Sequence, residues 1–150
     1  YQIRELQNGG EFVVLLFLAA WGNDTLAYCT GMLIGKHKMS PILSPKKSIE
    51  GLVGGIVGAA ILGALYGLYL NTYIRFSFNP VTMFPIVCGL SGAVSVIGDL
   101  AASAIKRDSG IKDYGTLIPG HGGILDRFDS IIFIAPVIYY LTVMISGGAI

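Results

Sequence analysis

Side chains able to do chemistry are concentrated between Ser103 and Asp129, where basic, acidic and glycine residues follow one another and long apolar runs lie on either side. A membrane protein tolerates such a density of charge only at a water-facing surface or in a polar cavity. We therefore expect this stretch to bind a charged ligand.

Three polar side chains, Asp99, Ser103 and Lys106, stand at positions i, i+4 and i+7. If one helix runs through them, they share a face. Asp and Ser supply oxygen ligands suited to Mg²⁺, and Lys can neutralise a phosphate. The alternative is an ordinary helix end, at which the dipole favours a Lys that pairs with the Asp.

Two further carboxylates, Asp126 and Asp129, stand at i and i+3 where the last apolar run begins. They could cap a helix, or they could face a ligand. The loop before them reads Gly120-His121-Gly122-Gly123, and glycines there let backbone N–H groups approach an anion closely. His121 could be a general acid or base or a ligand, but a lone histidine among glycines more often positions a loop or hydrogen-bonds a phosphate. With nearby basic residues, these features predict a site for phosphate and metal: Lys106, Arg107 and Lys112.

The earlier polar loop carries Lys46 and Lys47 shortly before an apolar run. Ser44 and Pro45 just before them predict a helix start, with Ser44 as the cap and Pro45 in the first turn. The two lysines could anchor the chain at the headgroup level or recruit an anionic substrate.

Asp24 lies inside an otherwise apolar stretch, Phe12 to Gly35, next to Asn23 and Thr25. A charge at that depth is costly unless it faces a partner or a water-filled space. The sequence therefore predicts that this span is interrupted around a hydrophilic cavity.

The composition indicates a membrane protein, since 53% of the 150 residues are hydrophobic, 13% are charged and the mean hydropathy is +0.69. A net charge of +1 gives no support for nucleic-acid binding. Besides the interrupted stretch, three uncharged runs reach the length of about 20 residues that crosses a bilayer: 51–70, 80–98 and 130–150. We expect an all-α polytopic bundle of about four transmembrane helices, with residues 1–150 forming one membrane-embedded unit.

Basic residues favour cytoplasmic loops, and eight of the ten fall in the two long connections: Lys36, Lys38, Lys46, Lys47, Lys106, Arg107, Lys112 and Arg127. Both long loops are therefore predicted to be cytoplasmic and both termini external. Glycines spaced four apart in the second run allow close helix packing, within the chain or in a homodimer: Gly51/Gly55, Gly54/Gly58 and Gly63/Gly67.

Taken together, the motifs resemble those of the phosphatidate cytidylyltransferases, also called CDP-diacylglycerol synthases. The family pattern appears here with its spacing kept, as Ser103, Lys106-Arg107, Lys112-Asp113, Pro119, His121-Gly122-Gly123 and Asp126-Arg127-Phe128-Asp129. The Ser-Pro-Lys-Lys segment with Glu50-Gly51 and the Gly-Asn-Asp-Thr segment around Asp24 are also similar to that family.

The resemblance implies transfer of a cytidylyl group from CTP to phosphatidic acid at a cavity that opens to the cytoplasm, in an integral protein of the cell (inner) membrane. It also implies a metal centre with Mg²⁺, where a monovalent cation such as K⁺ could join it. The family's metal-binding carboxylates match Asp99 and Asp126. We expect Asp99, Lys106 and Asp126 to be catalytic and Ser103 and Asp129 to be further metal ligands. The expected substrate-binding residues are Asp24, Lys46, Lys47, Ser103, Arg107, Lys112, His121, Gly122, Gly123 and Arg127.

Two other functions stay open from the sequence. One is a related lipid enzyme with a different acceptor, similar to a CDP-archaeol synthase or a polyprenol kinase. The other is an ion-coupled transporter, because carboxylates inside membrane helices often mark ion paths. Members of the resembled family usually carry more N-terminal spans, so we expect this chain to correspond to the C-terminal catalytic part.

Overall fold

The computed structural model describes residues 2–6, 8–40, 44–111 and 125–145, except for the side chains of residues 44–46 and 125–127. The described elements are α1 (Gln2–Glu5), α2 (Gly9–Phe17), η1 (Leu18–Gly22), α3 (Asn23–Ile34), β1 (Lys38–Ser40), β2 (Ser44–Ser48), α4 (Ile49–Tyr73), α5 (Pro80–Asp108) and α6 (Leu125–Ile145). Four stretches are long and apolar enough to cross a membrane: Gly9–Ile34, Ile49–Tyr73, Pro80–Asp108 and Phe128–Ile145. The predicted all-α membrane bundle is confirmed.

The first span is continuous, so the predicted interruption at Asn23-Asp24-Thr25 is wrong. α2 passes into a π-helical turn, η1, and then directly into α3, whose first residue is Asn23. Asn23 is fully buried, and its side-chain oxygen lies where a Cβ atom at Gly55 would come within 2.8 Å and one at Gly92 within 3.0 Å. Two glycines on neighbouring helices thus make room for the Asn23 side chain. The first span therefore continues through Asn23 without a break.

The helix start predicted at Ser44 and Pro45 is also wrong, because residues 44–48 form a strand. β2 pairs antiparallel with β1, with Lys38 opposite Ser48. α4 begins only after the hairpin, and Ser48 caps it by accepting a hydrogen bond from the Gly51 N–H at 3.1 Å. Strand pairing therefore uses the residues that would otherwise have formed the first helical turn.

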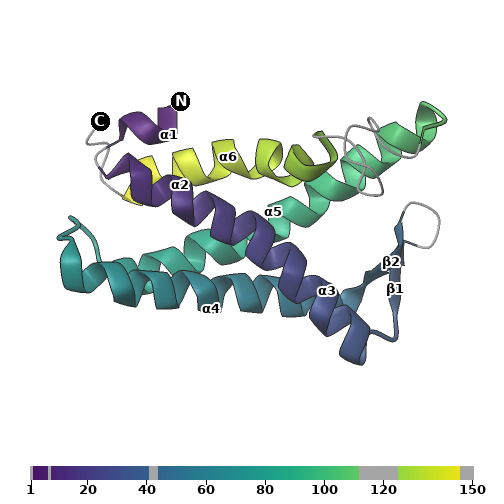
Figure 1. Ribbon diagram of the computed structural model, residues 1–150, viewed down its shortest axis with the longest axis horizontal. Coiled ribbons are helices and arrows are strands. Elements are labelled where there is room, and N and C mark those ends of the chain that lie inside the picture. The colour runs from purple at the N-terminus through teal and green to yellow at the C-terminus, as the bar shows by residue number, and fades with distance from the viewer. Residues whose placement is uncertain (1, 7, 41–43, 112–124, 146–150) are drawn as a thin grey trace.

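Figure 1 shows the hairpin β1–β2 and the C-terminal end of α5 at one end of the bundle. The connection between α4 and α5 lies at the opposite end, together with α1 and the last turns of α6. This arrangement has the up-and-down alternation expected from the basic residues. The two charged connections begin at the same end, which we call the hairpin end.

α4 packs between α3 and α5 through its glycines. A Cβ atom at Gly51 would lie 2.7 Å from the Ala27 carbonyl oxygen of α3. Farther along, a Cβ atom at Gly63 would lie 2.7 Å from the Phe84 carbonyl oxygen of α5. Absent side chains let the backbones approach, so these faces pack within the chain.

The opposite end of the bundle is held by aromatic packing. Phe84 of α5 is 1% exposed, and its ring lies 6.1 Å from that of Phe12 and 5.7 Å from that of Phe76, both edge-on. Edge-on aromatic pairs add about 0.5–1.5 kcal/mol beyond area burial. This cluster holds α2 and α5 together at one end of the bundle. The polar groups described below lie at the hairpin end.

We predict that Gly63→Ala lowers the stability of the bundle by about 1–3 kcal/mol, because the new methyl group must push α4 away from α5. Gly89→Ala is the matched control, since a Cβ atom at Gly89 meets only the Ala60 methyl group, at an ordinary 3.7 Å. Thermal unfolding in detergent, followed by circular dichroism, measures the difference. Equal midpoints for the two variants would contradict the packing argument.

Candidate functional site

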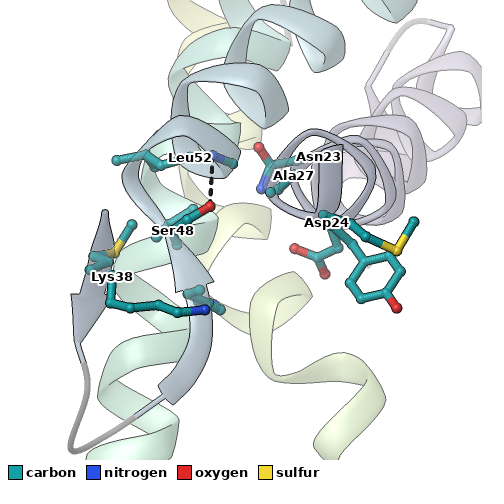
Figure 2. Close-up of a pocket in the computed structure, with 13 residues that line it drawn as sticks. Asn23, Asp24, Ala27, Lys38, Ser48 and Leu52 are labelled. Atoms are coloured by element: carbon teal, nitrogen blue, oxygen red, sulfur yellow. Dashed lines mark hydrogen bonds between the residues drawn. The ribbon is translucent and has the colours of Figure 1, made fainter. Parts of the chain in front are cut away.

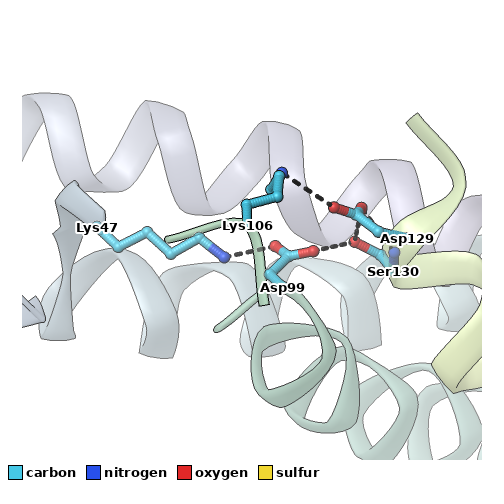
Figure 3. Close-up of polar contacts among 5 residues, drawn as sticks. All are labelled: Lys47, Asp99, Lys106, Asp129 and Ser130. Atoms are coloured by element: carbon cyan, nitrogen blue, oxygen red, sulfur yellow. Dashed lines mark hydrogen bonds and ion pairs between the residues drawn. The ribbon is translucent and has the colours of Figure 1, made fainter. Parts of the chain in front are cut away.

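The carboxylate of Asp99 lies at the centre of a polar cluster at the hairpin end. Its Oδ2 atom pairs with Nζ of Lys47, from β2, at 2.5 Å. Its Oδ1 atom accepts a hydrogen bond from the hydroxyl of Ser130, in the second turn of α6. The side chain of Asp99 is 16% exposed and that of Lys47 is 29% exposed. Both oxygens of this largely buried carboxylate therefore have partners (Figure 3).

A second ion pair lies beside the first. Nζ of Lys106, near the end of α5, is 4.0 Å from Oδ2 of Asp129 on α6, and both side chains are largely buried. Asp129 Oδ1 accepts a hydrogen bond from the backbone N–H of Ser130 at 2.8 Å, and the Ser130 hydroxyl lies 3.5 Å from the same oxygen.

Ser130 thus connects the two ion pairs into one row, Lys47–Asp99–Ser130–Asp129–Lys106 (Figure 3). The row joins the hairpin, α5 and α6, which come from distant parts of the sequence. An ammonium group stands at each end and the two carboxylates lie between them, on either side of Ser130, so the row itself has no net charge. Such an arrangement holds the carboxylates in place near the surface of the bundle.

Helix periodicity explains how α5 contributes to this row. α5 extends to Asp108, so Asp99, Ser103 and Lys106 share a face as predicted, and all three are partly buried. The alternative, in which Asp99 pairs with Lys106 at a simple helix end, is not what the structure shows. Asp99 instead pairs with Lys47, and Lys106 with Asp129.

A cavity of about 460 Å³ lies between α3, the hairpin and the start of α4 (Figure 2). Asp24 lines it, and the charges that act on Asp24 include Asp99 and Lys47. The expectation of a polar cavity at Asp24 therefore agrees with the structure, although the helix that carries Asp24 is unbroken. Lys47 lines this cavity as well and belongs to both features.

The remaining predicted site residues divide into three groups. Arg107 is exposed in the last turn of α5, outside the row. Lys46 lies in β2, and Asp126 and Arg127 lie in the first turn of α6, but their side chains are not described. The others fall outside the described residues altogether: Lys112, His121, Gly122 and Gly123.

The donor chemistry of the row fits a hard divalent cation. The Ser130 hydroxyl contacts one oxygen of Asp99 and one of Asp129, so two carboxylates and a hydroxyl converge, and Mg²⁺ prefers such oxygen ligands. Among the side chains that the structure describes, no group of three or more His, Cys, Asp or Glu residues is close enough to hold a metal ion. A third carboxylate ligand would therefore have to come from a side chain that the structure does not describe. Asp126, three residues before Asp129, is such a residue.

Sequence reasoning missed Ser130 and Lys38. Ser130 is the first residue of the last uncharged run, so from the sequence it was treated as the start of a membrane span and not as a site residue. Its position immediately after Asp129 and four residues after Asp126 was the available signal, since i and i+4 share a helix face. Lys38 lines the cavity and gave no signal, because only the unexpected hairpin brings it there.

Comparison with known proteins shows the family to which the chain belongs. The model of a family described as the cytidylyltransferase family matches residues 2–145. A phosphatidate cytidylyltransferase of Staphylococcus saprophyticus is 37% identical over 97% of this chain and 54% of its own length. The enzyme of the same name from Staphylococcus aureus strain COL is 41% identical over 90% of this chain and 50% of its own.

The chain spans about half the length of the curated relatives it matches. The matched region includes α2 to α6, which together form the hairpin, the cavity and the row around Asp99. The chain belongs to the cytidylyltransferase family.

Proposed function

We propose that the protein transfers a cytidylyl group from CTP to phosphatidic acid and releases pyrophosphate, giving CDP-diacylglycerol for phospholipid synthesis. The relatives described above carry the name of this activity. The observation that carries the proposal is the row of paired carboxylates and lysines around Asp99, beside a cavity that has both charged and apolar walls.

The reaction needs no protein nucleophile. An oxygen of the lipid phosphate, ionised at neutral pH, forms a new bond to the α-phosphorus of CTP. The bond from that phosphorus to the oxygen bridging it to the β-phosphorus breaks, and its electrons leave with pyrophosphate. Positioning and electrostatic stabilisation do most of the work in such phosphoryl chemistry, which agrees with a site built from Lys and Asp.

Each residue of the row has a role in this reaction. Two polyanions must meet, so Lys47 and Lys106 offset their repulsion and stabilise the charge that develops on the leaving group. Asp99 and Asp129, with Asp126 and Ser103, would hold Mg²⁺, which when bound supplies a Lewis acid for the phosphate oxygens. Ser130 orients Asp99 and Asp129 through its hydroxyl group.

The site faces the cytoplasm in this proposal. Basic residues mark the cytoplasmic side of membrane proteins, and the hairpin end carries Lys36, Lys38 and Lys47 on one connection and Lys106 and Arg107 where the other begins. CTP would enter from the water, and the lipid would enter from the inner leaflet of the cell membrane.

The acceptor is tested by supplying radiolabelled CTP and Mg²⁺ to the full chain in micelles with one lipid phosphate at a time. We expect labelled liponucleotide from phosphatidic acid, little or none from an ether-linked isoprenoid phosphatidate and, in a separate assay with γ-labelled CTP, no phosphorylation of a free polyprenol. Faster labelling of either alternative would replace the proposed acceptor. Cation flux through liposomes without CTP, and no labelled lipid, would instead favour a transporter.

Asp99→Asn is predicted to reduce turnover by about 100-fold or more, because a preorganised charge is lost from the centre of the row. Asp108→Asn is the control, since Asp108 is exposed at the end of the same helix and its loss should leave turnover unchanged. Turnover is measured as CTP-dependent liponucleotide per mole of folded protein. Full activity of the Asp99 variant would contradict the assigned role.

Ser130→Ala is predicted to raise the Mg²⁺ concentration needed for half-maximal activity by about 10- to 100-fold, which is typical when a group that orients metal ligands is lost. Ser130→Thr keeps the hydroxyl and should restore most of the affinity. A Mg²⁺ titration after removal of metal with EDTA measures the effect. If Ser130→Ala lowers the rate at every Mg²⁺ concentration without shifting the midpoint, Ser130 does not act on the metal ligands.

A further inference from the structure

The cavity beside α3 has a wall that sequence reasoning did not foresee, the hairpin β1–β2. Lys38 and Met39 of β1 and Lys47 and Ser48 of β2 line it on this side, and α3 lines it on the other (Figure 2). The polar groups that line the cavity are carried by Asn23, Asp24, Tyr28, Lys38, Lys47 and Ser48.

The hairpin is held firmly against the start of α4. The carboxylate of Glu50 accepts hydrogen bonds from the backbone N–H of His37 at 3.2 Å and lies 2.6 Å from the Nδ1 atom of the His37 ring. The Ile49 N–H also donates to the His37 carbonyl oxygen at 3.0 Å. Residue 38 follows directly, so the base of β1, from which Lys38 projects, is fixed relative to α4.

Lys38 is a cation in the cavity that could bind an anion. The charged residues of the cavity lining are Lys38, Lys47 and Asp24. Lys47 is paired with Asp99, whereas Lys38 makes no ion pair with any residue that the structure describes. Figure 2 shows Lys38 on the hairpin wall and Asp24 on the α3 wall, so the two charges come from opposite sides of the cavity.

The rest of the lining is largely apolar and reaches the outer surface of the bundle. Tyr28 and Met32 of α3 line the cavity, yet 66% of Tyr28 and 67% of Met32 is exposed. They stand on a span long and apolar enough to cross a membrane, where an exposed apolar side chain is positioned to meet a lipid chain. The cavity therefore has an exposed apolar edge at α3 and carries its positive charge at the hairpin. This distribution suits an amphipathic anion better than a nucleotide, which is polar on most sides.

We propose that this cavity binds the lipid acceptor, a membrane lipid with a phosphomonoester head group, and that Lys38 contacts its phosphate. The apolar chains leave past Tyr28 and Met32 into the bilayer. Lys47 both lines the cavity and pairs with Asp99, so the bound phosphate lies next to the catalytic row. The inference deepens the proposed function and rests on it.

Steady-state kinetics of Lys38→Gln test the site. We expect the apparent KM for phosphatidic acid, as a mole fraction in mixed micelles, to rise about tenfold through loss of a charge-assisted hydrogen bond, with the KM for CTP unchanged. Lys36→Gln is the matched control, because Lys36 is an exposed lysine two residues away that does not line the cavity. A rise in the KM for CTP instead would assign the cavity to the nucleotide and overturn the proposal.

A second pair of variants tests the apolar side. Met32→Trp should narrow the exit of the chains, and so weaken binding of long-chain phosphatidic acid more than that of a short-chain form. Leu33→Trp is the control, since Leu33 is exposed on the same helix but does not line the cavity. Equal chain-length dependence in the two variants would count against the exit past Met32.

Binding without turnover separates this inference from the proposed reaction. Native mass spectrometry of the full chain with phosphatidic acid, and no CTP, should show fewer lipid adducts for Lys38→Gln than for Lys36→Gln. If the wild-type protein forms no liponucleotide but this difference persists, the lipid site stands and the proposed reaction fails. If the protein is active and both variants match it in adducts and in KM, the reaction stands and the lipid site is overturned.

Discussion

The hairpin end of the bundle depends on the compensation of one carboxylate, that of Asp99. A largely buried charge is tolerated only with partners, and removing one partner of such a pair costs about 3–5 kcal/mol. Lys47 and Ser130 supply these partners, and they come from the hairpin and from α6. The need to neutralise Asp99 therefore fixes where the hairpin and α6 stand relative to α5.

Close helix packing makes this compensation possible. α4 carries the hairpin at its N-terminal end and has to approach both α3 and α5, and glycines at Gly51 and Gly63 allow the contacts. Lys47 lies only four residues before Gly51, so the position of α4 determines how far its side chain must reach. The aromatic cluster around Phe84 fixes the other end of the bundle. A small displacement of α4 would thus change the distance between Lys47 and Asp99.

Local rules were enough to predict the spans and the shared face of Asp99, Ser103 and Lys106, because hydropathy and helix periodicity are properties of neighbouring residues. They failed at Ser44, where strand pairing with β1 replaced the expected helix cap. They also failed at Asn23, where glycines on two other helices accommodate the polar group that was expected to break the span. Ser130 was missed because it begins an apolar run, although its spacing from Asp126 and Asp129 was a local signal. Lys38 was missed because only the pairing of β1 with β2 brings it to the cavity.

The row around Asp99 and the cavity beside α3 have different surroundings. This difference suits them to different ligands. The row from Lys47 to Lys106 consists of charged and hydroxyl groups that face one another, which suits phosphates and a metal ion. The cavity beside α3 joins two lysines to exposed apolar side chains of that helix. A reaction between a water-soluble nucleotide and a membrane lipid needs both environments within the reach of one phosphate group. Lys47 belongs to both features, so in the proposed function the nucleotide and the lipid phosphate meet beside it.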